Sequence, residues 1–320
     1  MRGAVIRLGI AVAALIGAFL GAVAILNTTI YSPAGYVQTY VDALVRKDPG
    51  AALGLAGPLP SSSALDDLLT EDVMPDLEVT EITELKSTGS RHRVEVRAVV
   101  AGQPTTAEFE LEETGSILGL FPQWGFARTP LVQLDLQVLH ASEFTANGVR
   151  RVAPAPNAAR TYLAFTPGAI TFGHESTLLT APDRAVVFGS PTRPVAVTIN
   201  PLPNDTFTEA VRSQAHAFLD ACAEQQVLYP VGCPFGQDLA DRLASPPSWT
   251  ILAYPPTTLL PTTTLGEWTV PVGEGVAEVD AEVRSIYDGS VTPFTAAVEY
   301  RIGYVVTLVG EEIIVTPRLG

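Results

Sequence analysis

The 320-residue sequence has few basic groups, few cysteines and no Cys-x-x-Cys pair. Nineteen lysines and arginines, of which only two are lysines, stand against 34 acidic residues, so the formal net charge is −15. Because most of such a surface repels phosphates, neither nucleic acid nor an anionic lipid surface is expected as the main partner. A composition of 47% apolar and 17% charged residues excludes a disordered polyelectrolyte and supplies enough apolar surface for hydrophobic cores.

The sequence also lacks the common signatures of catalysis and metal binding. None of its four histidines stands in His-x-x-x-His or His-Glu-x-x-His spacing, and there is no Gly-x-Ser-x-Gly or glycine-rich phosphate loop. His174 and Ser176 are interpreted as a loop pair. The acidic group Asp66, Asp67, Glu71 and Asp72 lacks the calcium-loop pattern and is interpreted as a solvated helix face. The sequence therefore predicts no enzyme, no cofactor and no metal.

One long apolar run is present, at the N-terminus. Residues 8–26 contain no charge and no proline, and as a helix they would reach about 28 Å at 1.5 Å per residue, close to the roughly 30 Å of a bilayer core. They predict a transmembrane anchor after a tail at 1–7. Arg2 and Arg7 precede the run, which places the N-terminus in the cytoplasm and residues 27–320 outside the cell membrane. The alternative is a cleaved signal peptide, because Ala22-Val23-Ala24 is a small-x-small site; both interpretations export the chain.

Export determines how the two cysteines are interpreted. Outside the cytoplasm, Cys222 and Cys233 are most simply a disulfide, which would stabilise the fold by roughly 2–3 kcal/mol. A metal site that adds His216 is the first alternative, although no fourth ligand is nearby. Free thiols are the second.

Charge divides the rest of the chain into three blocks. Residues 27–130 hold 15 acidic and 7 basic groups, residues 131–205 hold 5 and 5, and residues 206–320 hold 14 and 5. This asymmetry predicts three separately built modules.

Both acidic blocks place helices before strands. In 27–130, Ser32-Pro33 opens an amphipathic helix that ends near Lys47, short helices are expected at 50–55 and 64–69, and alternating strands follow Pro75. In 206–320, a helix over 206–227 capped by Asp205 or Thr206 and a short helix at 237–243 precede several strands, with a hairpin at Asp288-Gly289. Residues 131–205 show short strands separated by turn residues, which is typical of a small β-sandwich. The predicted class is α+β, with two helix-plus-antiparallel-sheet modules flanking that sandwich.

These patterns resemble a known family. The stretch Ser-Pro-x-x-Tyr-Val-x-x-Tyr-Val-x-Ala-Leu at 32–44 resembles the opening of NTF2-like cone domains in bacterial envelope proteins, and the unit with Cys222 and Tyr-Pro-Val-Gly-Cys-Pro-Phe at 229–235 is similar to their C-terminal domain. The segment 162–170 resembles a turn of their β-rich middle domain. The broad relatives are TcaA-like envelope proteins and the NTF2-like domain of low-affinity penicillin-binding proteins. The sequence lacks the Ser-x-x-Lys and Lys-Thr-Gly motifs of a transpeptidase domain, so the resemblance assigns no functional residues to this chain.

The resemblance implies a cone that could hold a ligand. Tyr36, Tyr40 and Asp42 in the first module, and His216 with Asp220 in the third, are candidates for a pocket acid or base. Aromatic core packing and a surface i, i+4 pair are the favoured interpretation. The function predicted is therefore a non-catalytic, membrane-anchored binding or scaffolding protein of the bacterial envelope, with an envelope protein or cell-wall component as partner. The alternatives are a small-molecule-binding or enzymatic cone and an accessory subunit of an envelope transport complex.

Overall fold

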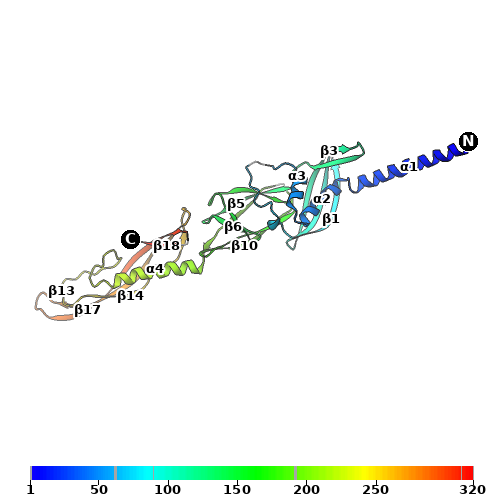
Figure 1. Cartoon of the computed structure of the whole chain (residues 1–320). Coiled ribbons are helices and arrows are strands. Elements are labelled where there is room, and N and C mark those ends of the chain that lie inside the picture. The colour runs from blue at the N-terminus through cyan, green and yellow to red at the C-terminus, as the bar shows by residue number, and fades with distance from the viewer. Residues whose placement is uncertain (1, 61–62, 89, 191–192, 311, 320) are drawn as a thin grey trace. The chain divides into compact units, whose positions relative to one another are not determined.

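The computed structural model describes residues 2–60, 63–88, 90–190, 193–310 and 312–319. The chain forms two compact units. The first comprises Met1–Val138, Ser142–Gly173 and Pro182–Ile199, and the second comprises Leu139–Ala141, His174–Ala181 and Asn200–Gly320. Sheets dominate and helices are few (Figure 1), so the predicted α+β class is confirmed. The module boundaries expected at residues 130 and 205 stay predictions.

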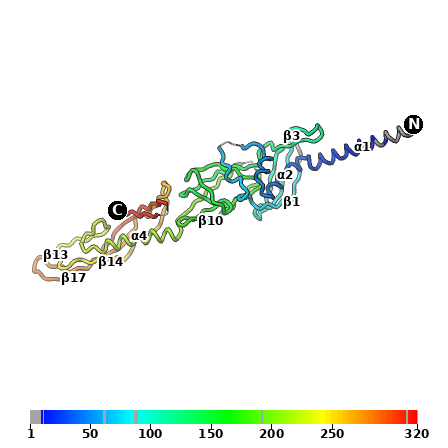
Figure 2. Tube along the Cα trace, in the orientation of Figure 1, coloured from blue at the N-terminus to red at the C-terminus, as the bar shows by residue number. Residues whose placement is uncertain are grey.

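The first unit opens with three helices. They are α1 (Arg2–Thr28), α2 (Pro33–Val45) and α3 (Pro49–Ala56), and α1 extends away from the remainder of this unit (Figures 1 and 2). The Ser32 hydroxyl oxygen accepts a hydrogen bond from the Gly35 amide at 3.0 Å and so caps α2, with Pro33 in the first turn. The predicted helix start is thus confirmed.

A four-stranded antiparallel sheet follows in the order β1-β2-β3-β4. Its strands are β1 (Leu77–Thr88), β2 (Arg91–Val100), β3 (Gln103–Ile117) and β4 (Phe121–Phe126), and a single 3-10 turn, Glu71–Val73, precedes them. On β2, buried Val94, Val96, Ala98 and Val100 alternate with more exposed residues, because successive side chains of a strand point to opposite faces. The buried face of α2 packs against this sheet.

Two further sheets follow, one of three strands and one of five. Strands β11 (Val195–Ile199), β5 (Leu131–Val138) and β8 (Arg160–Phe165) form one, in which β11 runs parallel to β5. The order of the other is β12-β10-β9-β6-β7; these strands are β12 (Leu202–Pro203), β10 (Leu179–Phe188), β9 (Gly168–Glu175), β6 (Glu143–Ala146) and β7 (Val149–Val152). Leu131, Leu163, Phe165 and Ala169 belong to the same buried cluster as the side chains of α2. One core therefore joins the predicted first module to the predicted sandwich.

The short helix expected at 64–69 is wrong. The Leu65 amide donates to the Thr161 carbonyl and the Leu163 amide donates to the Leu65 carbonyl, both at 2.9 Å, so Leu65 forms a β-bridge beside Tyr162. Leu68 and Leu69 are buried. Bonding to a neighbouring strand has replaced the local helix that the apolar spacing suggested.

The second unit packs one helix on a sheet. Helix α4 (Asp205–Ala223) precedes β13 (Arg242–Leu243), β14 (Ser248–Ala253), β15 (Leu260–Pro261), β16 (Glu267–Arg284), β17 (Val291–Val309) and β18 (Glu312–Leu319). The sheet order is β13-β16-β17-β18, with β14 and β15 also paired to β16. The predicted hairpin at Asp288-Gly289 joins β16 to β17, and Gly289 has a φ of 76°.

Two details of the second unit differ from the sequence interpretation. Asn204 caps α4 in place of Asp205 or Thr206, since its side-chain oxygen accepts from the Phe207 amide at 3.0 Å. The helix expected at 237–243 is wrong, because Arg242 and Leu243 pair with Arg284 and Val283 of β16. The edge of a long strand offers these two residues the backbone partners that an isolated short helix lacks.

Candidate functional site

Helix α1 exposes an apolar surface over residues 12–22. From Val12 to Ala22 every side chain is exposed, and Leu15 keeps 71% of its surface. A helix that is hydrophobic all round is normally buried in a core or in a membrane. Among the described residues, no helix taken alone is both long and apolar enough to cross a membrane. Val12–Thr28 and Pro33–Val45 together are long and apolar enough, but the two helices are bent by 53° relative to each other.

The end of α1 is fixed to the first unit. The Asn27 side-chain amide donates to the Leu120 carbonyl at 3.0 Å, and the Trp124 indole donates to the Tyr31 carbonyl at 2.8 Å. The Tyr31 ring stacks on Phe121 with centroids 4.5 Å apart. Gly35 lies so close to the chain leaving α1 that a Cβ would come within 2.3 Å of the Thr29 carbonyl oxygen. This junction holds the last turn of α1 against β4.

Tyr36, Tyr40 and Asp42 do not converge on a pocket. Tyr40 is fully buried, and its hydroxyl is 3.0 Å from both the Pro130 and the Thr166 carbonyl oxygens. Burial raises the pKa of Tyr40 above its usual range and also raises the pKa of Tyr36, whose hydroxyl donates to the Leu55 carbonyl. Asp42 accepts a hydrogen bond from Gln38 at 3.0 Å on the same helix.

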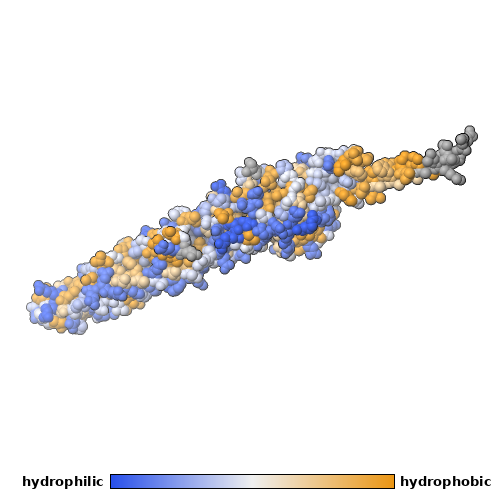
Figure 3. All heavy atoms as spheres, viewed as in Figure 1, coloured by the Kyte–Doolittle hydropathy of each residue, from blue (hydrophilic) through white to orange (hydrophobic). Residues whose placement is uncertain are grey.

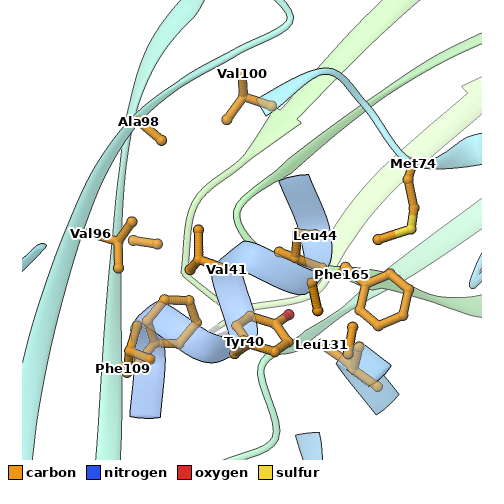
Figure 4. Close-up of a cluster of buried hydrophobic side chains, with 14 of the residues drawn as sticks. Tyr40, Val41, Leu44, Met74, Val96, Ala98, Val100, Phe109, Leu131 and Phe165 are labelled. Carbon is orange, nitrogen blue, oxygen red and sulfur yellow. The ribbon is translucent and has the colours of Figure 1, made fainter. Parts of the chain in front are cut away.

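The space around Tyr40 is filled by side chains. Figure 4 shows its ring among aliphatic and aromatic neighbours from α2, β2 and β3, and from residues 131 and 165. Clefts on the first unit lie elsewhere: one of about 510 Å³ beside Arg128 and Arg193, and one of about 460 Å³ along Thr28 and Ile82. Tyr40 lines neither of these clefts.

His216 and Asp220 lie one turn apart on α4, and Tyr254 contacts both of them. The rings of His216 and Tyr254 stack with centroids 3.9 Å apart, and the Tyr254 hydroxyl donates to the Asp220 carboxylate. That hydrogen bond, followed by burial, raises the pKa of Tyr254 to about 12. A protonated tyrosine on a carboxylate holds the end of β14 to α4, which is a structural role.

The other candidate groups are bound by neighbours. His174 Nε2 lies 3.2 Å from Ser176 Oγ, and the Ser176 hydroxyl donates to the Leu179 carbonyl; the two side chains pair as predicted, but His174 lies in strand β9 and not in a loop. In the acidic group, Asp72 pairs with Arg151 at 3.0 Å, and hydrogen bonds from Thr70 and then Arg151 lower its pKa. Within the described residues, no three His, Cys, Asp or Glu side chains are grouped to hold a metal ion.

The predicted disulfide is present and closes a loop after α4. Cys222 and Cys233 are joined with Cα atoms 5.8 Å apart. Inside this loop the Val231 amide donates to the Gln225 side-chain oxygen at 2.8 Å, and the Trp249 indole donates to the Val227 carbonyl at 2.9 Å. Gly236 allows the Tyr229 ring to approach the backbone closely, because a Cβ at position 236 would collide with that ring.

The braced loop presents apolar side chains to solvent. Val231 keeps 85% of its surface exposed, and Val227 and Tyr229 are also exposed. Exposed apolar side chains that are held in place by a braced backbone can serve in a protein-binding surface. We call residues 225–237 the disulfide loop. The Tyr-Pro-Val-Gly-Cys motif is visible in the sequence, but the exposure of its side chains is known only from the structure.

No family model matches the chain, and no curated protein matches it. The chain has a weak similarity to a solved structure described as an "Ntf2 like protein involved in plasmid conjugation". The match covers 77% of this chain and 79% of that protein's chain, with 10% sequence identity and a TM-score of 0.12. So low a TM-score does not establish a common fold. The NTF2-like and TcaA-like resemblances stay predictions.

Proposed function

We propose that the chain is a membrane-anchored binding or scaffolding protein of the bacterial cell envelope, with residues 27–320 outside the cytoplasm. The observation that carries this proposal is the uncovered apolar surface of α1. The apolar face of α2 is already buried against the sheet, whereas residues 12–22 of α1 present exposed apolar side chains of the kind a bilayer accepts. Arg2 and Arg7 at its start favour a cytoplasmic N-terminus.

The modules beyond the anchor are proposed to be two NTF2-like folds flanking a β-sandwich, used for binding without catalysis. The filled space around Tyr40 favours binding at the surface over a ligand inside a cone. The disulfide loop is the proposed binding surface, and an envelope protein or a cell-wall component is the proposed partner. A disulfide in this loop suits an oxidising compartment.

Charges placed within α1 test the anchor. Replacing Leu15 and Leu20 by aspartate is expected to remove the chain from the alkali-resistant membrane fraction, because each central aspartate disfavours insertion by about 2.5–3.5 kcal/mol. Tyr287→Asp is the matched control, since Tyr287 is 94% exposed in the second unit and should stay in the membrane. Membrane retention of the doubly charged chain would contradict the proposal. A mature protein that begins after Ala24 would identify a signal peptide instead.

Site-specific photocrosslinking tests the disulfide loop. A crosslinking amino acid at position 231 in intact cells is expected to capture an envelope component, whereas the same group at position 287, which is also exposed, should not. Val231→Asp should weaken the captured interaction more than about fivefold if Val231 is a binding hot spot, which corresponds to at least 1 kcal/mol. Equal capture from positions 231 and 287 would reject the loop as the binding surface.

A further inference from the structure

The tip of the β3–β4 hairpin is apolar where a turn is normally polar. The Leu120 amide donates to the Ile117 carbonyl at 3.0 Å, and the two central residues, Leu118 and Gly119, have φ values of 53° and 67°. Positive φ at both central residues of a β-turn favours Asn-Gly or Asp-Gly, because a leucine side chain is strained there. The β6–β7 turn of the same unit does use Asn147-Gly148.

Leucine at this turn contributes nothing to the core. Leu118 keeps 86% of its surface exposed, and Ile117 and Leu120 beside it are also exposed. Folding alone would therefore favour asparagine over leucine at position 118, on grounds of both backbone conformation and solvation. A leucine at position 118 would be favoured if an apolar environment outside the protein covered its side chain.

The position of the tip identifies that environment. Leu120 accepts the hydrogen bond from Asn27, in the last turn of α1, and Phe121 stacks on Tyr31 just beyond it. Figure 1 shows the hairpin reaching the base of α1, and in Figure 3 the hydrophobic colouring of α1 continues onto the adjoining end of the first unit. Tyr31 and Trp124, joined by a hydrogen bond, are residue types enriched where a membrane meets water.

We infer that the hairpin tip, residues 117–120, inserts into the outer leaflet of the same bilayer that α1 crosses. The inference rests on the proposed function, because it requires α1 to be a membrane span. The partner of this surface is the acyl and interfacial region of lipid, which accepts apolar side chains without charge complementarity. With two insertions joined by the Asn27 and Tyr31 contacts, the first unit has a restricted orientation on the membrane.

Lipid-side quenching in vesicles tests the insertion. The full chain, with its disulfide intact, is labelled with an environment-sensitive dye at a cysteine placed at position 118, 19 or 103 and reconstituted in phosphatidylcholine vesicles. Gln103 is the solvent control, since it is exposed at the opposite end of β3, and position 19 reports α1. We expect lipids carrying brominated acyl chains to quench the dyes at 118 and 19, and to leave the dye at 103 unchanged.

The outcomes separate the two proposals. Quenching at 19 without quenching at 118 would overturn the hairpin insertion and leave the anchor standing, whereas no quenching at either position would overturn both. A dye at 118 that is shielded from aqueous iodide, but not quenched by brominated lipid, would show a protein contact and also overturn the insertion.

Leu118→Asn supplies a second variant that should fold at least as well as the parent. Asparagine tolerates the positive φ, so the thermal midpoint is expected to stay equal or rise. Lipid quenching of a dye at position 117 should fall sharply in this variant if Leu118 holds the tip in the bilayer. Unchanged quenching at 117 would overturn the role assigned to Leu118.

Discussion

Replacing Tyr40 by alanine is expected to lower the free energy of unfolding of the first unit by about 3–5 kcal/mol, the range for truncating a large buried aromatic side chain. The Tyr40 ring lies edge-on to Phe126 and Phe109, with centroids 5.1 and 6.0 Å apart. Truncation would leave a cavity at the centre of the core and would orphan the Thr166 carbonyl. Hydrogen exchange followed by mass spectrometry reports peptides of α2 and β2 separately from those of the second unit, so it measures this loss directly.

Tyr40→Phe is the matched control because it keeps the ring and removes only the hydroxyl. It should cost about 1–3 kcal/mol, the range for leaving a buried acceptor such as the Thr166 carbonyl without its donor. The Pro130 carbonyl keeps the Thr166 hydroxyl as a donor at 3.0 Å in this variant. If the alanine and phenylalanine variants were equally destabilised, the hydroxyl and not the packing would dominate. An alanine variant as stable as the parent would contradict the description of this core.

Replacing Cys222 and Cys233 together by serine is expected to lower the stability of the second unit by about 3 kcal/mol, because the open chain regains conformational freedom that the crosslink removes. The first unit should be unaffected. The measurement is urea unfolding of both proteins, again with exchange of α4 peptides as the local reading. A loss confined to the first unit, or none at all, would contradict the assignment.

The same double variant separates loop rigidity from loop chemistry. Val227, Tyr229 and Val231 remain in place, but the brace that holds them is gone. The yield of captured partner from a crosslinker at position 231 should be lower than in the parent protein, because the loop is more mobile without the disulfide. Gln225→Ala is the control, since it removes the hydrogen bonds to Val231 while keeping the disulfide. Its effect on capture should be the smaller of the two.

Sequence periodicity located the long elements because local preference and tertiary packing agreed there. The apolar spacing of residues 36–45 predicts α2, and the same reasoning predicts α4. It failed for 64–69 and 237–243, where short segments bond to the backbone of neighbouring strands. A pattern of side chains cannot reveal a distant strand that will satisfy those amides.

The candidate site was less predictable than the fold, since exposure is a property of the folded chain. Tyr40 and Asp42 are both polar groups on a predicted core-facing helix, yet Tyr40 is fully buried and Asp42 is half-buried. Tyr254 was missed because it is 34 positions from Asp220. The Leu118-Gly119 turn did carry a readable signal: an apolar residue at a turn position that favours asparagine.

The path of the chain through the two units limits how this protein could be rearranged. Residues 139–141 and 174–181 belong to the second unit, although the first unit continues on both sides of each segment. Cutting the chain at any one peptide bond therefore cannot give two fragments that each contain one complete unit. A protease that nicks the chain near residue 140 would therefore interrupt the first unit as well as the second.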